Sequence, residues 1–173
     1  MNIEDLLKRR INLPEIKLIM AWVTRSNTRR AHLWQLAKSN ERQTSVNALW
    51  VLTHLSATDS KWLGSLQDEL IDMLLIENDR SKKRLLLKLL REQEFHPESL
   101  RTDLIDYCLS KINSECEAYA TRAFCIYVAF KMCRHYPELA AELKEHLAVL
   151  SHQNLSPGLT CARRKTLAAI DKL

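Results

Sequence analysis

The stretch AYATRAFCIYVAFKMC, residues 118–133, is the most apolar part of the chain and decides its fold. Thirteen of its sixteen residues are apolar or aromatic, and only Thr121, Arg122 and Lys131 interrupt the run. A helix that is apolar on nearly every side must be covered by several other elements. Because crossing a bilayer takes about 20 apolar residues, we expect no membrane span here. The stretch therefore predicts the most buried helix of an all-α domain.

Prolines and capping residues mark where the other helices are expected to begin. Proline fits the first helical turn because its missing N–H would be unpaired there, and an acid nearby favours the positive end of the helix dipole. Ser114 and Glu117 have the spacing of a capping box and predict the start of the central helix. All four prolines stand at such starts: Pro14, Pro97, Pro137 and Pro157.

No part of the sequence shows the alternation that a β-strand needs, whereas apolar residues recur at helical spacing throughout. We expect about ten helices in antiparallel pairs. Short connectors between them indicate a single domain over residues 1–173. The predicted spans are Asn2–Arg10, Pro14–Arg25, Thr28–Lys38, Gln43–Leu55, Lys61–Ile76, Arg80–Glu92, Pro97–Ile112, Ala118–Cys133, Pro137–Leu150 and Pro157–Lys172.

The second helices of successive pairs resemble one another. TSVNALWVL, SKKRLLLKLL, YATRAFCIYV and CARRKTLAAI each have a polar start followed by a dense apolar run. Aligning Asn47, Arg84, Arg122 and Arg163 gives steps of 37, 38 and 41 residues. A two-helix unit of about 40 residues indicates a helical solenoid, in which each pair buries its apolar faces against the next.

On these residues the chain resembles the HEAT-like (armadillo-type) helical repeat family. Arg84, Arg122 and Arg163 carry the likeness, and Asp79 before Arg84 fits the acid-then-arginine pattern of that family. The resemblance covers residues 60–173 well and residues 1–58 less well. It implies a right-handed α-α superhelix whose second helices line the concave side. The motif is degenerate, so it predicts a fold and little about function.

Basic clusters provide the candidate binding residues. The net charge of +5 permits an acidic partner or nucleic acid without requiring either. On the concave side such residues could follow a phosphate backbone; the alternative is a solvated face with arginine–aspartate pairs between repeats. Arg84, Lys88 and Arg91 fall on one stripe of their helix. The candidates are Arg29, Arg30, Arg80, Lys83, Arg84, Lys88, Arg91, Arg122, Arg163 and Arg164.

Residue patterns for catalysis, cofactors or metals are not recognisable in the sequence. Two glycines exclude a glycine-rich phosphate loop, and the six histidines have no nucleophile partner in a motif. Five cysteines without a C-x-x-C motif suit a reducing compartment, and Cys125 and Cys133 are expected in the core. The first ten residues lack the apolar run of a signal peptide, so the cytoplasm is the expected location.

Two functional hypotheses follow. The first is a non-catalytic scaffold that binds a protein partner through its concave face or its ends. The second is nucleic-acid binding, because WVTRSNTRRA, residues 22–31, resembles the Trp…Asn…Arg-Arg-x-Ala pattern of HEAT-like alkylpurine DNA glycosylases. The resemblance implies a basic concave face that cradles DNA, although no catalytic acid of that family can be placed here. Pairing of the chain with a second copy stays open.

Overall fold

The computed structural model describes residues 2–173, which form ten α-helices and three short 3-10 segments, with no β-strand among these residues. Met1, part of the predicted domain, lies outside them. The prediction of an all-α fold is confirmed. The α-helices are α1 (Ile3–Leu7), α2 (Leu13–Val23), α3 (Asn27–Ala37), α4 (Arg42–Leu52), α5 (Gln67–Ile76), α6 (Arg80–Arg91), α7 (Thr102–Ile112), α8 (Tyr119–Cys133), α9 (Pro137–Val149) and α10 (Pro157–Ile170).

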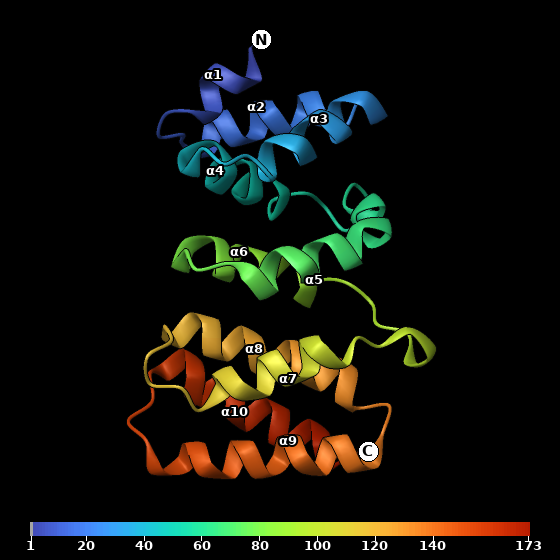
Figure 1. Ribbon diagram of the computed structural model, residues 1–173, viewed down its shortest axis with the longest axis vertical. Coiled ribbons are helices and arrows are strands. Elements are labelled where there is room, and N and C mark those ends of the chain that lie inside the picture. Colours follow the sequence, from blue (N-terminus) through green and yellow to red (C-terminus); the bar gives the residue numbers. More distant parts are fainter. Residues whose placement is uncertain (1) are drawn as a thin grey trace. The chain divides into compact units, whose positions relative to one another are not determined.

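The chain divides into two compact units, the first ending at Asp68 and the second beginning at Glu69. In the first unit, α4 packs against α1, α2 and α3, and α2 packs against α3 (Figure 1). A capping box fixes the start of α2: Asn12 accepts from the backbone N–H of Glu15, whose carboxylate accepts from the N–H of Asn12. Trp34 is buried in this unit.

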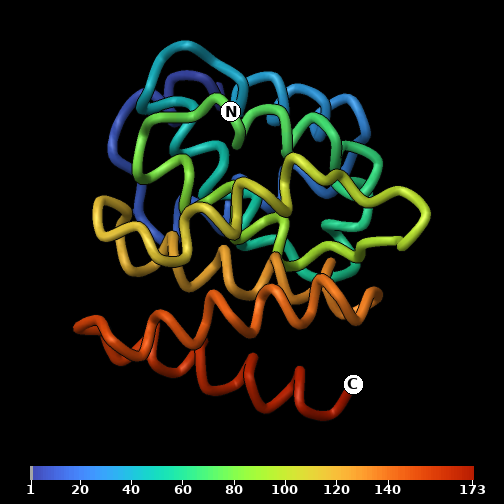
Figure 2. The backbone as a smooth tube through the Cα atoms, turned by 60° about the horizontal axis from the view of Figure 1, so that its bottom comes forward, coloured from blue at the N-terminus to red at the C-terminus, as the bar shows by residue number. Residues whose placement is uncertain are grey.

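In the second unit, α8 is the central helix. It contacts α6, α7, α9 and α10, and eight of its fifteen residues are buried. Figures 1 and 2 show α9 and α10 side by side at the C-terminal end of this unit. Residues 118–133 thus form a helix that four others cover, but the prediction of the most buried helix does not hold by buried share, since seven of the eleven residues of α4 are buried. Cys125 and Cys133 are buried on this helix, as expected.

Three of the four predicted proline starts are confirmed. Pro14, Pro137 and Pro157 all stand in the first turn of an α-helix. Pro97 instead begins the 3-10 segment η2 (Pro97–Ser99), and α7 starts only at Thr102. The intervening Leu100 has extended backbone angles, φ −66° and ψ 131°, which separate the two segments. The predicted helix Pro97–Ile112 is therefore too long at its N-terminal end.

Other helix ends differ from the predictions as well: the helices predicted to end at Arg10 and Leu55 end at Leu7 and Leu52. The residues before α5 form the 3-10 segment η1 (Lys61–Leu66), so the predicted helix Lys61–Ile76 is α-helical only in its second part. The predicted capping box of Ser114 and Glu117 is wrong: α8 begins after Ala118, which gives no side-chain cap. The Glu117 carboxylate binds lysines instead. No helix in residues 2–173 is long and apolar enough to cross a membrane.

Candidate functional site

Two arginines of the predicted repeat register bind the end of the preceding helix. The Nε of Arg122 in α8 donates to the carbonyl oxygen of Ile112, the last residue of α7, at 2.8 Å. The Nε of Arg163 in α10 donates to the carbonyl oxygen of Leu147, in the last turn of α9, at 2.7 Å. The last carbonyl groups of a helix lack partners within it and carry its negative dipole end, so cations stabilise them.

Asn47 in the first unit makes equivalent hydrogen bonds with its side-chain amide. Its Nδ2 donates to the carbonyl oxygen of Leu7, the last residue of α1, at 2.8 Å, and to that of Arg9 at 2.7 Å. Asn47 is buried, and the packing of α4 against α1 places its side chain at the end of α1. Three of the four register residues, Asn47, Arg122 and Arg163, therefore fasten a second helix to the C-terminal end of another helix.

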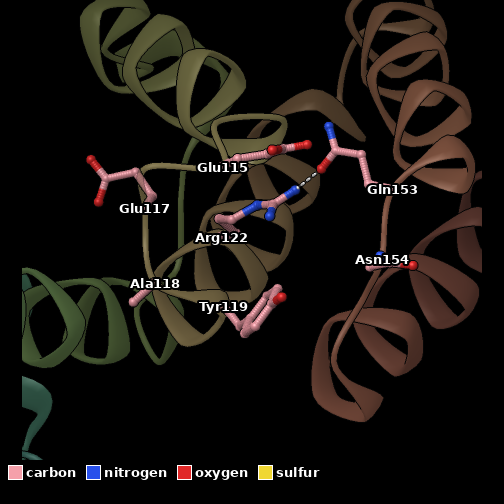
Figure 3. Close-up of a pocket in the computed structure, with 7 residues that line it drawn as sticks. All are labelled: Glu115, Glu117, Ala118, Tyr119, Arg122, Gln153 and Asn154. Carbon is pink, nitrogen blue, oxygen red and sulfur yellow. Dashed lines mark hydrogen bonds between the residues drawn. The ribbon is translucent and has the colours of Figure 1, made fainter.

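Arg122 also lies beside a pocket of about 410 Å³ at the start of α8 (Figure 3). Its guanidinium donates to Oε1 of Gln153, and the amide of Gln153 donates to the carbonyl oxygen of Asn113 at 3.2 Å. Only 2% of Arg122 is exposed, so its guanidinium binds groups in the interior of the unit and is shielded from solvent. The pocket is lined by Glu115, Glu117, Ala118, Tyr119, Arg122, Gln153 and Asn154.

Lys83 and Lys111 both bind Glu117, in the loop before α8. The distances to its Oε1 are 3.0 Å from the Nζ of Lys83 and 3.3 Å from that of Lys111. Burial opposes ionisation of this carboxyl group, but the two lysines outweigh it and hold the pKa of Glu117 below its usual range. This ion-pair cluster joins α6, α7 and the start of α8.

The exposed side of α6 is a row of four cations. Asp79 fixes the start of this helix, since its carboxylate accepts from the backbone N–H groups of Ser81 and Lys82 at 2.9 and 3.0 Å. Spacings of four, four and three residues then place the four cations on one side. None of the four forms an ion pair with another residue in the part of the chain that the structure describes. The row consists of Arg80, Arg84, Lys88 and Arg91.

Aromatic rings of α8 flank this row. The guanidinium of Arg91 lies 4.1 Å from the ring centroid of Tyr127 and 5.8 Å from that of Phe124. Lys131 lies one helical turn after Tyr127, and its Nζ donates to the carbonyl oxygen of Gln93, just after Arg91, at 2.7 Å. The contacts therefore advance in the same direction along both helices, so α6 and α8 run parallel. We call the exposed side of these two helices the second-helix face. Its residues are Arg80, Arg84, Lys88, Arg91, Phe124, Tyr127, Lys131 and Arg134.

A family model of the HEAT repeat domain matches residues 3–170, which is nearly the whole chain. The chain belongs to the HEAT repeat family. No curated protein and no solved structure matches it. Membership explains the arrangement of the second unit, because in such repeats each helix pair buries its apolar faces against the next pair. It accounts for the fold and leaves the function to be argued from the surface.

Charge is segregated between the two helix sets of the second HEAT unit. The exposed sides of the first helices α7 and α9 carry carboxylates, whereas that of the second helix α6 carries only cations. Asp103 is held by Arg101, whose hydrogen bond lowers the pKa of this carboxyl group. The α7 and α9 side is predominantly acidic, with Lys144 as an exposed exception, whereas the α6 row is wholly basic. The exposed acids of α7 and α9 are Asp103, Asp106, Glu138, Glu142 and Glu145.

Arg29 and Arg30 lie in the other unit, where their contacts are local. Arg29 donates to the carbonyl oxygen of Trp22 at 3.2 Å, and its guanidinium lies 4.9 Å from the Trp22 ring centroid. Arg30 donates to Oδ1 of Asn27 at 3.2 Å and to the carbonyl oxygen of Thr24 at 3.3 Å. The residues of the Trp…Asn…Arg-Arg pattern therefore hold the turn between α2 and α3.

The structure thus brings four of the predicted binding residues together, on α6, and separates the others. Lys83, Arg122 and Arg163 bind groups of their own unit, while Arg164 is exposed on α10. Sequence reasoning missed Tyr127 and its neighbours on α8. The signal was present, because Tyr127, Lys131 and Arg134 follow the same spacing of four and three as Arg84, Lys88 and Arg91.

Titratable groups elsewhere are dispersed or shielded. Burial raises the pKa of the Cys133 thiol to about 12, and burial together with Cys125 raises that of Cys108. Both thiols therefore stay protonated and unreactive at neutral pH. Within residues 2–173, no group of three or more His, Cys, Asp or Glu side chains is placed to hold a metal ion.

Proposed function

We propose that this HEAT repeat protein is a non-catalytic scaffold that binds a protein partner through the second-helix face. The observation that carries the proposal is the cation row of α6, which lies beside the aromatic rings of α8 without neutralising acids of its own. We also propose that both units belong to one HEAT repeat domain, which the match over residues 3–170 supports. Five free cysteines support a cytoplasmic location.

The composition of the second-helix face favours a protein as the partner. Arginine and tyrosine are the residues that most often carry binding energy at protein interfaces. Arg91 and Tyr127 are half-buried and held against each other, so little side-chain freedom is lost when a partner covers them. Lys131 and Arg134 already pair with Glu94. The other cations of the face, those of the α6 row, have no ion pair within residues 2–173, so they favour an acidic surface, which they would also attract over long range.

Nucleic acid is the alternative occupant, because a cation row also attracts phosphates. Its binding would weaken steeply with salt, as bound counterions are released from the nucleic acid. Arg29 and Arg30, which the sequence pattern associates with DNA, bind Trp22, Thr24 and Asn27 of their own unit. The alternative therefore depends on the α6 row and on the exposed Arg164 of α10.

Site-specific photo-crosslinking tests the proposal. A photoreactive amino acid replaces Lys88 on the second-helix face or, as a matched control, Asp106 on the opposite side of the same unit. We expect a protein adduct from position 88 and none from position 106. The purified adduct partner should then bind the wild-type chain at least ten times more tightly than it binds the R84E/K88E variant.

Three results would contradict the proposal. The first is a nucleic-acid adduct at position 88, and the second is equal labelling at positions 88 and 106. The third is a partner whose affinity R84E/K88E leaves unchanged. The variant R164E/K165E is the charge-matched control, because it reverses two exposed cations of α10 in the same unit. It should change the affinity by less than twofold.

A further inference from the structure

We infer that the partner segment which covers the second-helix face is an acidic amphipathic α-helix lying along α6. This inference rests on the proposed function and specifies the partner. It follows from the geometry of the cation row, from the aromatic flank on α8, and from the absence of any open backbone groups on this face.

The cation row has the length and spacing of a helix stripe. Eleven residues separate Arg80 from Arg91, which corresponds to about 16 Å along the axis of α6. Carboxylates at spacings of four, four and three on a second helix would repeat at the same intervals. Each could then meet one cation, as arginine and carboxylate pair well across helix surfaces.

The aromatic flank supplies the apolar half of the site. Phe124 and Tyr127 are half-buried, so each leaves part of its ring on the surface beside the cations. Arg91 bridges the two rows, since its guanidinium lies over both rings. A helix with acids on one stripe and apolar residues on the next would complement both rows at once.

Other occupants fit this face less well. Bases of a single strand bind by stacking on open aromatic faces, but the guanidinium of Arg91 already lies over the Tyr127 ring. An extended peptide that binds by strand addition needs a sheet edge for its backbone hydrogen bonds, and α6 and α8 bond their own backbone groups internally. An α-helix satisfies its own backbone and needs only side-chain contacts.

Fluorescence anisotropy with designed peptides tests the inference at 150 mM salt. The first probe is a helical 21-residue peptide with four glutamates at spacings of four, four and three, and leucines on the adjacent stripe. The second has the same composition in an order that breaks both stripes. The third is a 12-nucleotide single-stranded DNA. We expect the first probe to bind at least tenfold more tightly than either of the others.

The same variants locate the binding. R84E/K88E should weaken the first probe at least tenfold, and the neutral R84Q/K88Q should weaken it by an intermediate factor. The control R164E/K165E should change it by less than twofold. Arg84 is exposed and Lys88 half-buried without ion pairs, so both α6 variants should keep the circular dichroism and melting temperature of the wild type.

Three outcomes overturn the inference: equal affinity for both peptides, tighter binding of the DNA, or no binding of the first peptide. If any of these occurs while crosslinking at position 88 still yields a protein whose affinity depends on Arg84 and Lys88, the scaffold function stands and only the helical partner is wrong. If crosslinking also fails, the proposed function fails with it.

Discussion

The starts of α6 and α8 carry the same residue at the same point of the repeat, yet use it in opposite ways. Arg122 of α8 is buried and holds the end of α7, whereas Arg84 of α6 is exposed and binds nothing within residues 2–173. The two arginines are separated by 38 residues, one repeat step. The repeat therefore fixes where an arginine stands without fixing what it does.

The two arginines differ in helix phase. Arg122 is the fourth residue of α8, whereas Arg84 is the fifth residue of α6, and one residue turns a side chain by about 100°. The fourth residue of α6 is Lys83, which does point inward and binds Glu117 at 3.0 Å. On α6 the cation with an ion pair is thus Lys83, which binds the loop before α8, and Arg84 lies on the surface.

Removing the inward arginine should have the largest effect. We expect Arg122→Ala to lower the free energy of unfolding by about 3 kcal/mol, because it leaves a cavity and deprives Ile112 and Gln153 of a charged donor. Guanidinium unfolding followed by circular dichroism measures the change. A loss as small as that of an exposed arginine would show that Arg122 does not hold α7 to α8.

The equivalent residue of the other unit should have the next largest effect. Asn47→Ala removes two hydrogen bonds to the end of α1, and we expect a loss of about 2 kcal/mol. Hydrogen exchange should show faster exchange of the α1 amides. Asn40→Ala, at an exposed asparagine of the same unit, is the control. If the α1 amides exchange at the same rate in both variants, Asn47 does not fasten this helix.

The sequence predicted the helices better than their ends, and the site less well than either. Asp79, Pro137 and Pro157 mark helix starts because each acts on the backbone next to it. Glu117 has the spacing of a capping residue, yet Lys83 and Lys111 bind its carboxylate. Those lysines lie six and 34 residues away, so local spacing could not reveal the competition. Arg84 and Arg122 likewise differ by one position from the start of their helices. Predicted helix starts are uncertain by at least one residue, so the sequence could not show which arginine is exposed.

The Glu117 cluster gives a pH dependence of intermediate size. The pKa of Glu117 is lower in the folded chain than in the unfolded chain. The contribution of Glu117 to folding stability is therefore complete above the unfolded-state pKa, and it disappears as the pH falls through the folded-state pKa. We expect Glu117→Gln to cost about 1 kcal/mol at pH 7. Melting temperatures from pH 7 to pH 3 should converge for the two proteins. Parallel curves would mean that Glu117 does not contribute to acid unfolding.

Arg84 should have the smallest effect on stability. We expect Arg84→Ala to change the free energy of unfolding by less than about 0.5 kcal/mol, since the side chain is exposed and alanine favours a helix at least as well. Lys83→Ala, at the neighbouring position, is the sharpest control. It removes the ion pair between Lys83 and Glu117, so it should lower the free energy of unfolding by about 1 kcal/mol. Equal costs at positions 83 and 84 would refute the phase argument. Unequal costs, with partner affinity lost only on changing Arg84, would separate the cation that holds the repeat together from the one that faces the partner.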